Sequence, residues 1–199
     1  MTITIGKKHL FIGVGVLFIL MFALLFLLNN QNETRVEEYK ASAKEMKINT
    51  MAASYICLVI LKDYHDTWSK AISNYYNEEN MIKERYNYYK SKGVLNKIED
   101  FIAVSKSNME KMYNAPSDYE KTQQVLDGLY NDMNTCYNMV KNPSGSLMSF
   151  ASKVVDLLND IESKNKETNI QIPISSSDIR AKINELTPLI GEISYSDSF

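Results

Sequence analysis

The chain carries one long apolar run near its N-terminus, and this run limits the fold more than any other feature. Leu10 to Leu28 form 19 residues with no charged or strongly hydrogen-bonding side chain. As a helix the run would be about 28 Å long, close to the roughly 30 Å hydrocarbon core of a bilayer. A cleaved signal peptide would have a shorter apolar stretch and a small-residue cleavage site, and a core helix would rarely be apolar all round. We therefore predict an uncleaved transmembrane anchor over residues 9–28.

The charges that flank the run predict its orientation. Lys7 and Lys8 precede it, whereas the first basic residue on the other side is Arg35. By the positive-inside rule, residues 1–8 form a cytoplasmic tail and the remainder is extracytoplasmic. Beyond residue 28 the chain holds 20 basic and 24 acidic residues, because only Lys7 and Lys8 come earlier. A net charge of −4 argues against a nucleic-acid partner, since such proteins usually present a basic face.

Helical periodicity dominates the rest of the sequence. No Gly or Pro occurs between Gly15 and Gly93, and apolar residues recur there at spacings of three and four. The pattern predicts a long first helix over 33–91, with a break near Asn77–Asn80 and a C-cap at Gly93. Four shorter helices are predicted at 94–114, 118–141, 146–163 and 177–190, with a capping box at Ser117 and Glu120.

These helices predict an all-α protein: one N-terminal transmembrane helix, then an antiparallel bundle of four to five helices with a long first helix. Residues 29–54 have a poor apolar stripe, so we expect a helical stalk there, solvated or paired with another copy. The bundle itself is expected over 55–199. Residues 164–175 are expected to form a loop, and the oligomeric state stays open.

The sequence gives little support for catalysis. His9 lies at the membrane edge, which leaves His65 as the one other histidine. Asp63, His65 and Asp66 are adjacent, but neighbouring side chains on a helix point about 100° apart and cannot converge on one metal ion. The chain has no phosphate-binding glycine loop and no nucleophile elbow. We predict no catalytic, metal or cofactor site, and therefore a protein that is not an enzyme.

Two cysteines and several tyrosines are the remaining candidates. Cys57 and Cys136 both fall on inward stripes, so they could form a disulfide or lie as two small buried thiols. Tyr76 and Tyr88 lie off the core stripe and are candidates for an interaction surface, because exposed tyrosines favour binding. Trp68, Tyr75, Tyr86 and Tyr89 lie on the stripe and are predicted to be core residues.

Three stretches resemble a family of small, uncharacterised, membrane- or lipid-anchored helical proteins of low-GC Gram-positive bacteria. They are Trp68–Ile72, Ala115–Glu120 and Asn142–Leu147, and together they span about residues 55–165. The resemblance implies a Gram-positive surface location and no known activity. Together with the residues, it predicts a non-catalytic envelope protein that binds another protein or a cell-envelope component. The alternative is an accessory or sensory subunit of a membrane complex.

Overall fold

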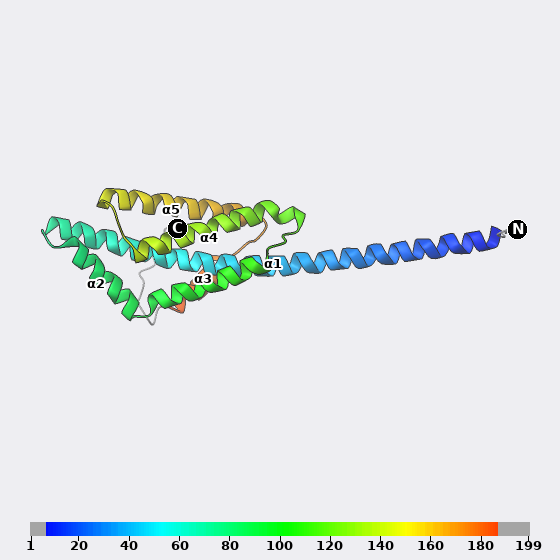
Figure 1. Ribbon diagram of the computed structural model, residues 1–199, viewed down its shortest axis with the longest axis horizontal. Helices are drawn as coiled ribbons and strands as arrows, with labels where there is room; N and C mark the ends of the chain where they lie inside the picture. The colour runs from blue at the N-terminus through cyan, green and yellow to red at the C-terminus, as the bar shows by residue number, and fades with distance from the viewer. Residues whose placement is uncertain (1–6, 187–199) are drawn as a thin grey trace. The chain divides into compact units, whose positions relative to one another are not determined.

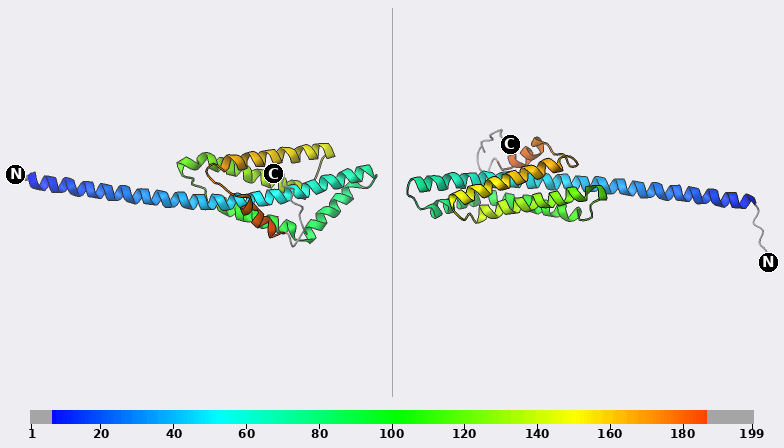
Figure 2. Two further views of the ribbon diagram at one scale, coloured as in Figure 1. Left: turned by 180° about the vertical axis from the view of Figure 1, so that it is seen from behind. Right: turned by 90° about the horizontal axis from the view of Figure 1, so that it is seen from above.

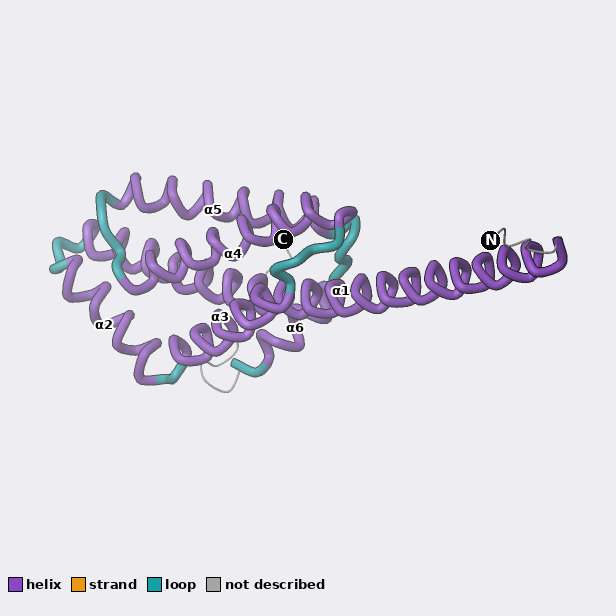
Figure 3. The backbone as a smooth tube through the Cα atoms, turned by 45° about the vertical axis from the view of Figure 1, so that its right-hand side comes forward, coloured by secondary structure: helices purple, strands orange, loops and turns teal. Residues whose placement is uncertain are grey.

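A computed structural model describes residues 7–186, without the side chains of 7–20 and 22–29. These residues form six α-helices and one short 3-10 helix, with no strand among them (Figure 3). The predicted all-α bundle is confirmed. Within the part of the chain that the structure describes, no helix is long and apolar enough to cross a membrane. The side chains of the predicted anchor, Met21 excepted, lie outside the described residues.

The helices follow one another with short connections (Figure 1). They are α1 (Lys7–Ser73), α2 (Glu78–Ser91), α3 (Val94–Lys111), η1 (Ser117–Tyr119), α4 (Glu120–Lys141), α5 (Leu147–Thr168) and α6 (Ser176–Asn184). The predicted break in the first helix is confirmed, but it lies a few residues earlier, between Ser73 and Glu78. Gly93 has φ +75° and ends α2, as its position in the sequence predicts.

Three local predictions are wrong. Ser117 and Glu120 form no capping box, because a 3-10 turn occupies Ser117–Tyr119 and α4 begins only at Glu120. The fourth predicted helix continues to Thr168, which shortens the expected loop. The last helix ends at Asn184, and Pro188, expected to end it, lies outside the described residues.

The chain divides into two compact units, residues 1–39 and residues 40–199. The predicted stalk of 29–54 is therefore too long, since Ala43, Met46 and Lys47 are already fully buried in the second unit. The apolar stripe of residues 40–54 is interrupted in the sequence, because Lys47 and Thr50 occupy inward positions that apolar residues usually fill. The bundle begins near Lys40, not at residue 55.

Within the second unit, α4 and α5 run antiparallel (Figure 1). Two ion pairs at different levels, Lys121 with Glu167 and Asp132 with Lys164, join them. The predicted stripe of α4 is buried: Leu126, Leu129, Met133, Cys136 and Val140 are all fully enclosed. The core is thus built from the apolar faces of α1, α3, α4 and α5, with further buried residues from α2 and α6.

Lys47 fixes the connection between α5 and α6. Its ammonium donates to the backbone oxygen of Asn165 at 3.2 Å, the side-chain oxygen of Asn169 at 2.7 Å and the backbone oxygen of Ile172 at 3.1 Å. A cation at the C-terminal end of α5 is also favoured by the helix dipole. Ser175 then caps α6 and forms a capping box with Asp178. The helix α6 therefore begins directly after the loop that Lys47 binds. Two further views show α6 beside α1 (Figure 2).

Candidate functional site

Large side chains are exposed at one end of the bundle, where α1 ends and α5 begins. We call this group the tip surface; it comprises Ile72, Tyr75, Tyr76 and Met148. Tyr75 is 98% exposed, Tyr76 61% and Met148 84%. Met148 belongs to the same end of the bundle because Trp68 of α1 packs on Phe150 of α5, with ring centroids 5.7 Å apart. Isolated exposed apolar residues are common, but a cluster often marks an interaction site.

The backbone at the end of α1 sets where the two tyrosines point. The Tyr76 N–H donates to Ala71 O at 3.0 Å and the Tyr75 N–H to Ile72 O at 3.3 Å, while Tyr75 has φ +58°. This is the Schellman arrangement, in which the residue after the cap takes a left-handed conformation. Glycine usually occupies that position, because a left-handed L-residue costs about 1–2 kcal/mol. The protein places a fully exposed tyrosine there instead.

The prediction that Tyr75 belongs to the core is wrong. Helical spacing continues through Tyr75 in the sequence, but α1 ends at Ser73 and the chain reverses its course. Asn74 supports this ending, since its side-chain amide donates to Lys70 O at 2.8 Å. Asn77 then starts α2 by accepting from the Asn80 N–H. Asparagines at both helix ends were the sequence signal for an earlier break.

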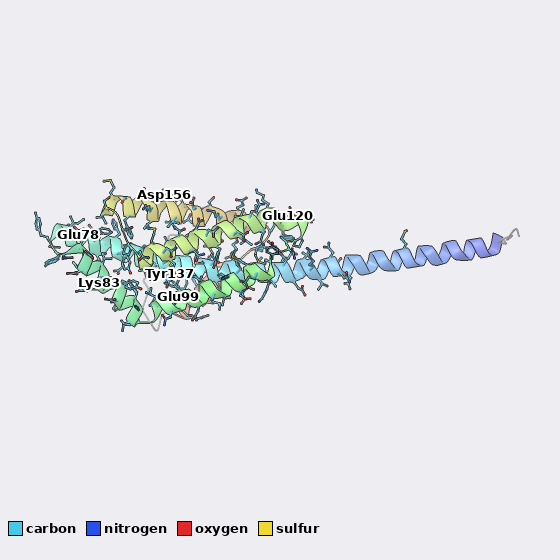
Figure 4. The ribbon with its side chains drawn as sticks, in the orientation of Figure 1. Glu78, Lys83, Glu99, Glu120, Tyr137 and Asp156 are labelled. Carbon is cyan, nitrogen blue, oxygen red and sulfur yellow. The ribbon has the colours of Figure 1, made fainter. Side chains whose placement is uncertain are left out.

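Beside the tip surface lies an open groove of about 680 Å³, the tip groove. It is lined by α1, α2 and the turn between α4 and α5: Trp68, Glu78, Glu79, Ile82, Lys83, Tyr86, Lys141, Asn142, Pro143, Ser144 and Gly145. Glu78 and Lys83 mark this end in Figure 4. The Trp68 indole N–H donates to Glu78 at 2.5 Å. Apolar rings and charges of both signs therefore share one concave surface.

A polar cluster holds α2 against α1 and so positions the tip groove. A single Asp63 oxygen accepts from Arg85 Nε at 2.6 Å and from the Tyr89 hydroxyl at 3.0 Å. The Arg85 guanidinium also lies over the rings of Tyr88 and Tyr89. Burial first, then the nearby Asp63 carboxylate, raises the pKa of Tyr89 to about 12. Tyr89 therefore stays a neutral donor throughout the physiological range.

The two tyrosines predicted as interaction candidates have different surroundings. Tyr76 stands in the tip surface. Tyr88 is 36% exposed and packs edge-on against Tyr89, with 5.3 Å between ring centroids. Lys92 and Arg85 lie over its ring at 5.8 and 5.0 Å. Tyr88 is thus engaged by its own helix and presents less free area to a partner than Tyr76 does.

Cys57 and Cys136 meet in the core as free thiols, and both are fully buried. Burial raises the pKa of Cys57 well above its usual range, and the hydrogen bond with Cys136 raises it further. The sequence left a disulfide and two core thiols open. The structure brings both residues together, which a disulfide requires and which two buried thiols also allow.

His65 does not assemble with both neighbouring carboxylates. Its Nδ1 lies 3.2 Å from Asp66, whose other oxygen accepts from Lys62 at 2.7 Å, whereas Asp63 faces Arg85. Lys62, and secondarily His65, lower the pKa of Asp66. Among residues 7–186, no three His, Cys, Asp or Glu side chains with described positions are grouped as a metal site would require.

No protein-family model, curated protein or solved structure matches this chain. The resemblance noted from the three sequence stretches therefore stays a prediction. Two of those stretches, Trp68–Ile72 and Asn142–Leu147, contribute residues to the tip groove or to the tip surface.

Proposed function

We propose that this chain is a membrane-anchored, extracytoplasmic, non-catalytic protein whose bundle binds another protein through the tip surface. The observation that carries the proposal is the pair Tyr75 and Tyr76. Tyr75 occupies a position where glycine would be more stable, yet its ring is almost wholly exposed. Strain kept at an exposed position is typical of sites under functional constraint.

The chemistry of the tip suits a protein partner. Tyrosine and methionine are enriched in protein interfaces, where an apolar ring or chain is buried. Tyr75, Tyr76 and Met148 supply these side chains, and the tip groove offers a concave neighbour with charged groups at its rim. Interfaces combine such an apolar centre with a polar margin.

The proposed location rests on the apolar run and its basic flank. Lys7 and Lys8 precede the run, and Leu10 to Leu28 hold no charge. Protease added to intact protoplasts should therefore digest the bundle. Full protection that is lost only on lysis would reverse the proposed orientation.

Binding is tested by crosslinking in intact cells that naturally produce the chain, with and without the change Tyr75→Ala plus Tyr76→Ala. The matched control is Tyr113→Ala, because Tyr113 is 86% exposed but follows α3 at the other end of the bundle. We expect one crosslinked protein that disappears in the double variant and persists in the control. Equal capture by all three proteins would refute binding through the tip.

A cell-envelope component is the second candidate for the ligand. Purified peptidoglycan that retained the full chain, and lost it in the same double variant, would replace the protein partner. The accessory or sensory alternative has one supporting feature, since α1 is a single helix from Lys7 to Ser73. That alternative involves a membrane partner that contacts the anchor. It predicts crosslinks from the anchor as well as from the tip.

A further inference from the structure

The helix α2 has few contacts with the core. Of its 14 residues, only Ile82 and Tyr89 are buried, whereas α4 buries at least one residue in every turn from Thr122 to Val140. Figure 1 shows α2 leaving the end of α1 at an angle and crossing to the start of α3. A segment with few buried apolar contacts opens locally at a lower free energy than the core does. The position of α2 therefore depends strongly on its polar contacts with α1.

Two polar contacts connect α2 to α1, one toward each end of α2. Toward the C-terminal end, one oxygen of Asp63 accepts from both Arg85 and Tyr89. Because Tyr89 is also buried, this end of α2 is held by the core as well. At the first residue of α2, the carboxylate of Glu78 accepts from the indole N–H of Trp68 at 2.5 Å. Glu78 is only partly buried, so the N-terminal end of α2 depends on this hydrogen bond.

Trp68 is the fixed side of the hydrogen bond. Its ring packs on Phe150 of α5 and against the hydrophobic core, so it does not need α2 to stay in place. Glu78 follows an exposed turn over residues 74–77, in which Tyr75 has φ +58°. Hinges are commonly a few residues at the end of a helix that absorb changes of φ and ψ. Glu78 is therefore the side that can move.

The Trp68–Glu78 hydrogen bond positions two parts of the proposed binding site. It joins residues ten apart in the chain, so it closes the segment 68–78, which carries the two exposed tyrosines of the tip surface. It also keeps α2 where its side chains line the tip groove opposite the turn between α4 and α5. Breaking it would alter the tip surface and the tip groove together.

We propose that the Trp68–Glu78 hydrogen bond is a latch that regulates binding at the tip. When the latch is closed, α2 forms one wall of the tip groove and the turn before it presents the tyrosines. When the latch is open, the N-terminal end of α2 moves away from Trp68 while Asp63 retains the C-terminal end. The binding surface is then lost. The regulation rests on the proposed function, whereas the movement of α2 does not.

The movement is tested without a partner, by hydrogen exchange and mass spectrometry on the purified full chain in an amphipathic polymer. Glu78→Ala breaks the latch, so amides in residues 73–84 should exchange severalfold faster than in the wild type, with 120–141 unchanged. Glu79→Ala is the matched control, because it removes a charge from the same first turn of α2, although Trp68 donates to Glu78 instead. Equal increases in both variants, no increase in Glu78→Ala, or faster exchange throughout the bundle would overturn the latch.

Glu78→Gln separates the hydrogen bond from the charge. Its amide oxygen still accepts from the indole, so exchange should stay close to that of the wild type. Exchange as fast as in Glu78→Ala would refute a latch made by the hydrogen bond. Trp68 is the only tryptophan of the chain, so its fluorescence gives a second measurement. Acrylamide should quench it more strongly in Glu78→Ala than in the wild type or in Glu78→Gln, and equal quenching in all three would contradict the latch.

The regulation is tested by crosslinking in intact cells. Glu78→Ala should capture the partner severalfold less than the wild type, whereas Glu110→Ala, which removes an exposed acid near the end of α3, should capture as much. Equal capture by the wild type and Glu78→Ala would refute the regulation and leave the proposed function standing. A wild type that captures no protein would refute both, whatever the hydrogen exchange shows.

Discussion

The ammonium of Lys47 lies 2.7 Å from the side-chain oxygen of Asn169, 122 residues further along the chain. The same Asn169 oxygen accepts from the Ile174 N–H at 3.3 Å, so one amide connects α1 to the loop before α6. Lys47→Met removes three hydrogen bonds and leaves buried oxygens with fewer partners. We expect a loss of about 1–3 kcal/mol in the free energy of unfolding, measured by urea titration in mild detergent. An unchanged value would show that this contact is not important for stability.

Burial of Lys47 should also make the free energy of unfolding depend on pH. Burial lowers its pKa from 10.5 to about 8, so between these values the unfolded chain holds the proton more often than the folded chain. Stability due to Lys47 should therefore rise with pH in that window. The raised pKa of Cys57 acts in the opposite direction, so the quantity to measure is the stability difference between wild type and Lys47→Met. That difference should grow from pH 8 to pH 10. A shrinking difference would mean that the folded state prefers the ammonium.

The substitution Tyr75→Gly should change stability and partner binding in opposite directions. Glycine adopts the left-handed conformation at φ +58° without the steric cost paid by tyrosine. The variant should be more stable by about 1 kcal/mol in thermal or urea unfolding, yet capture less partner in the crosslinking experiment. Gly93→Ala is the reverse control, because it places a side chain at φ +75° and should destabilise. Greater stability with undiminished capture would exclude Tyr75 from the binding surface.

Tyr64 has a buried hydroxyl with no hydrogen-bond partner among the described residues. Removing that oxygen in Tyr64→Phe should raise the free energy of unfolding by about 1 kcal/mol, because an unsatisfied polar group is lost. Tyr137→Phe is the matched control. Its hydroxyl donates to Glu99 at 2.6 Å (Figure 4), so the same change should lower stability. Equal effects from both substitutions would show that the Tyr64 hydroxyl does have a partner.

The buried thiol pair should be unreactive in the folded protein. Burial and the mutual hydrogen bond keep Cys57 protonated, and the thiolate is the reactive form. Iodoacetamide at pH 8 should therefore modify neither cysteine until urea is added. After unfolding without reductant, mass spectrometry should find both Cys57 and Cys136 alkylated. If neither is alkylated until reductant is present, the two form the disulfide that the sequence left open.

The sequence predicted the helices best where apolar spacing was uninterrupted. The α4 stripe from Leu126 to Val140 is buried as expected, and Gly93 marks a helix end by local chemistry that requires no knowledge of the fold. The predictions failed where tertiary contacts, rather than apolar spacing, determine which residues are buried. Lys47 is polar in sequence but inward in the fold, because loop oxygens distant in sequence satisfy its charge.

The residues of the tip surface could also be predicted only in part from the sequence. Tyr76 could be selected because it lies off the helical stripe. Tyr75 could not be selected from apolar spacing, which continues through it; only the asparagines at 74 and 77 indicate that α1 ends two residues before Tyr75. A groove between α1, α5 and α6 could not be predicted either, because its lining comes from three helices whose packing only the fold defines.

The most direct test of the proposed function places a photoreactive amino acid at single positions of the full chain in living cells. Position Tyr76 samples the tip surface, and position Tyr113, which is also exposed but lies at the other end of the bundle, is the control. Illumination should crosslink one partner protein from position 76 and not from position 113. Crosslinks of equal yield from both positions, or from position 113 alone, would contradict binding of a protein through the tip surface.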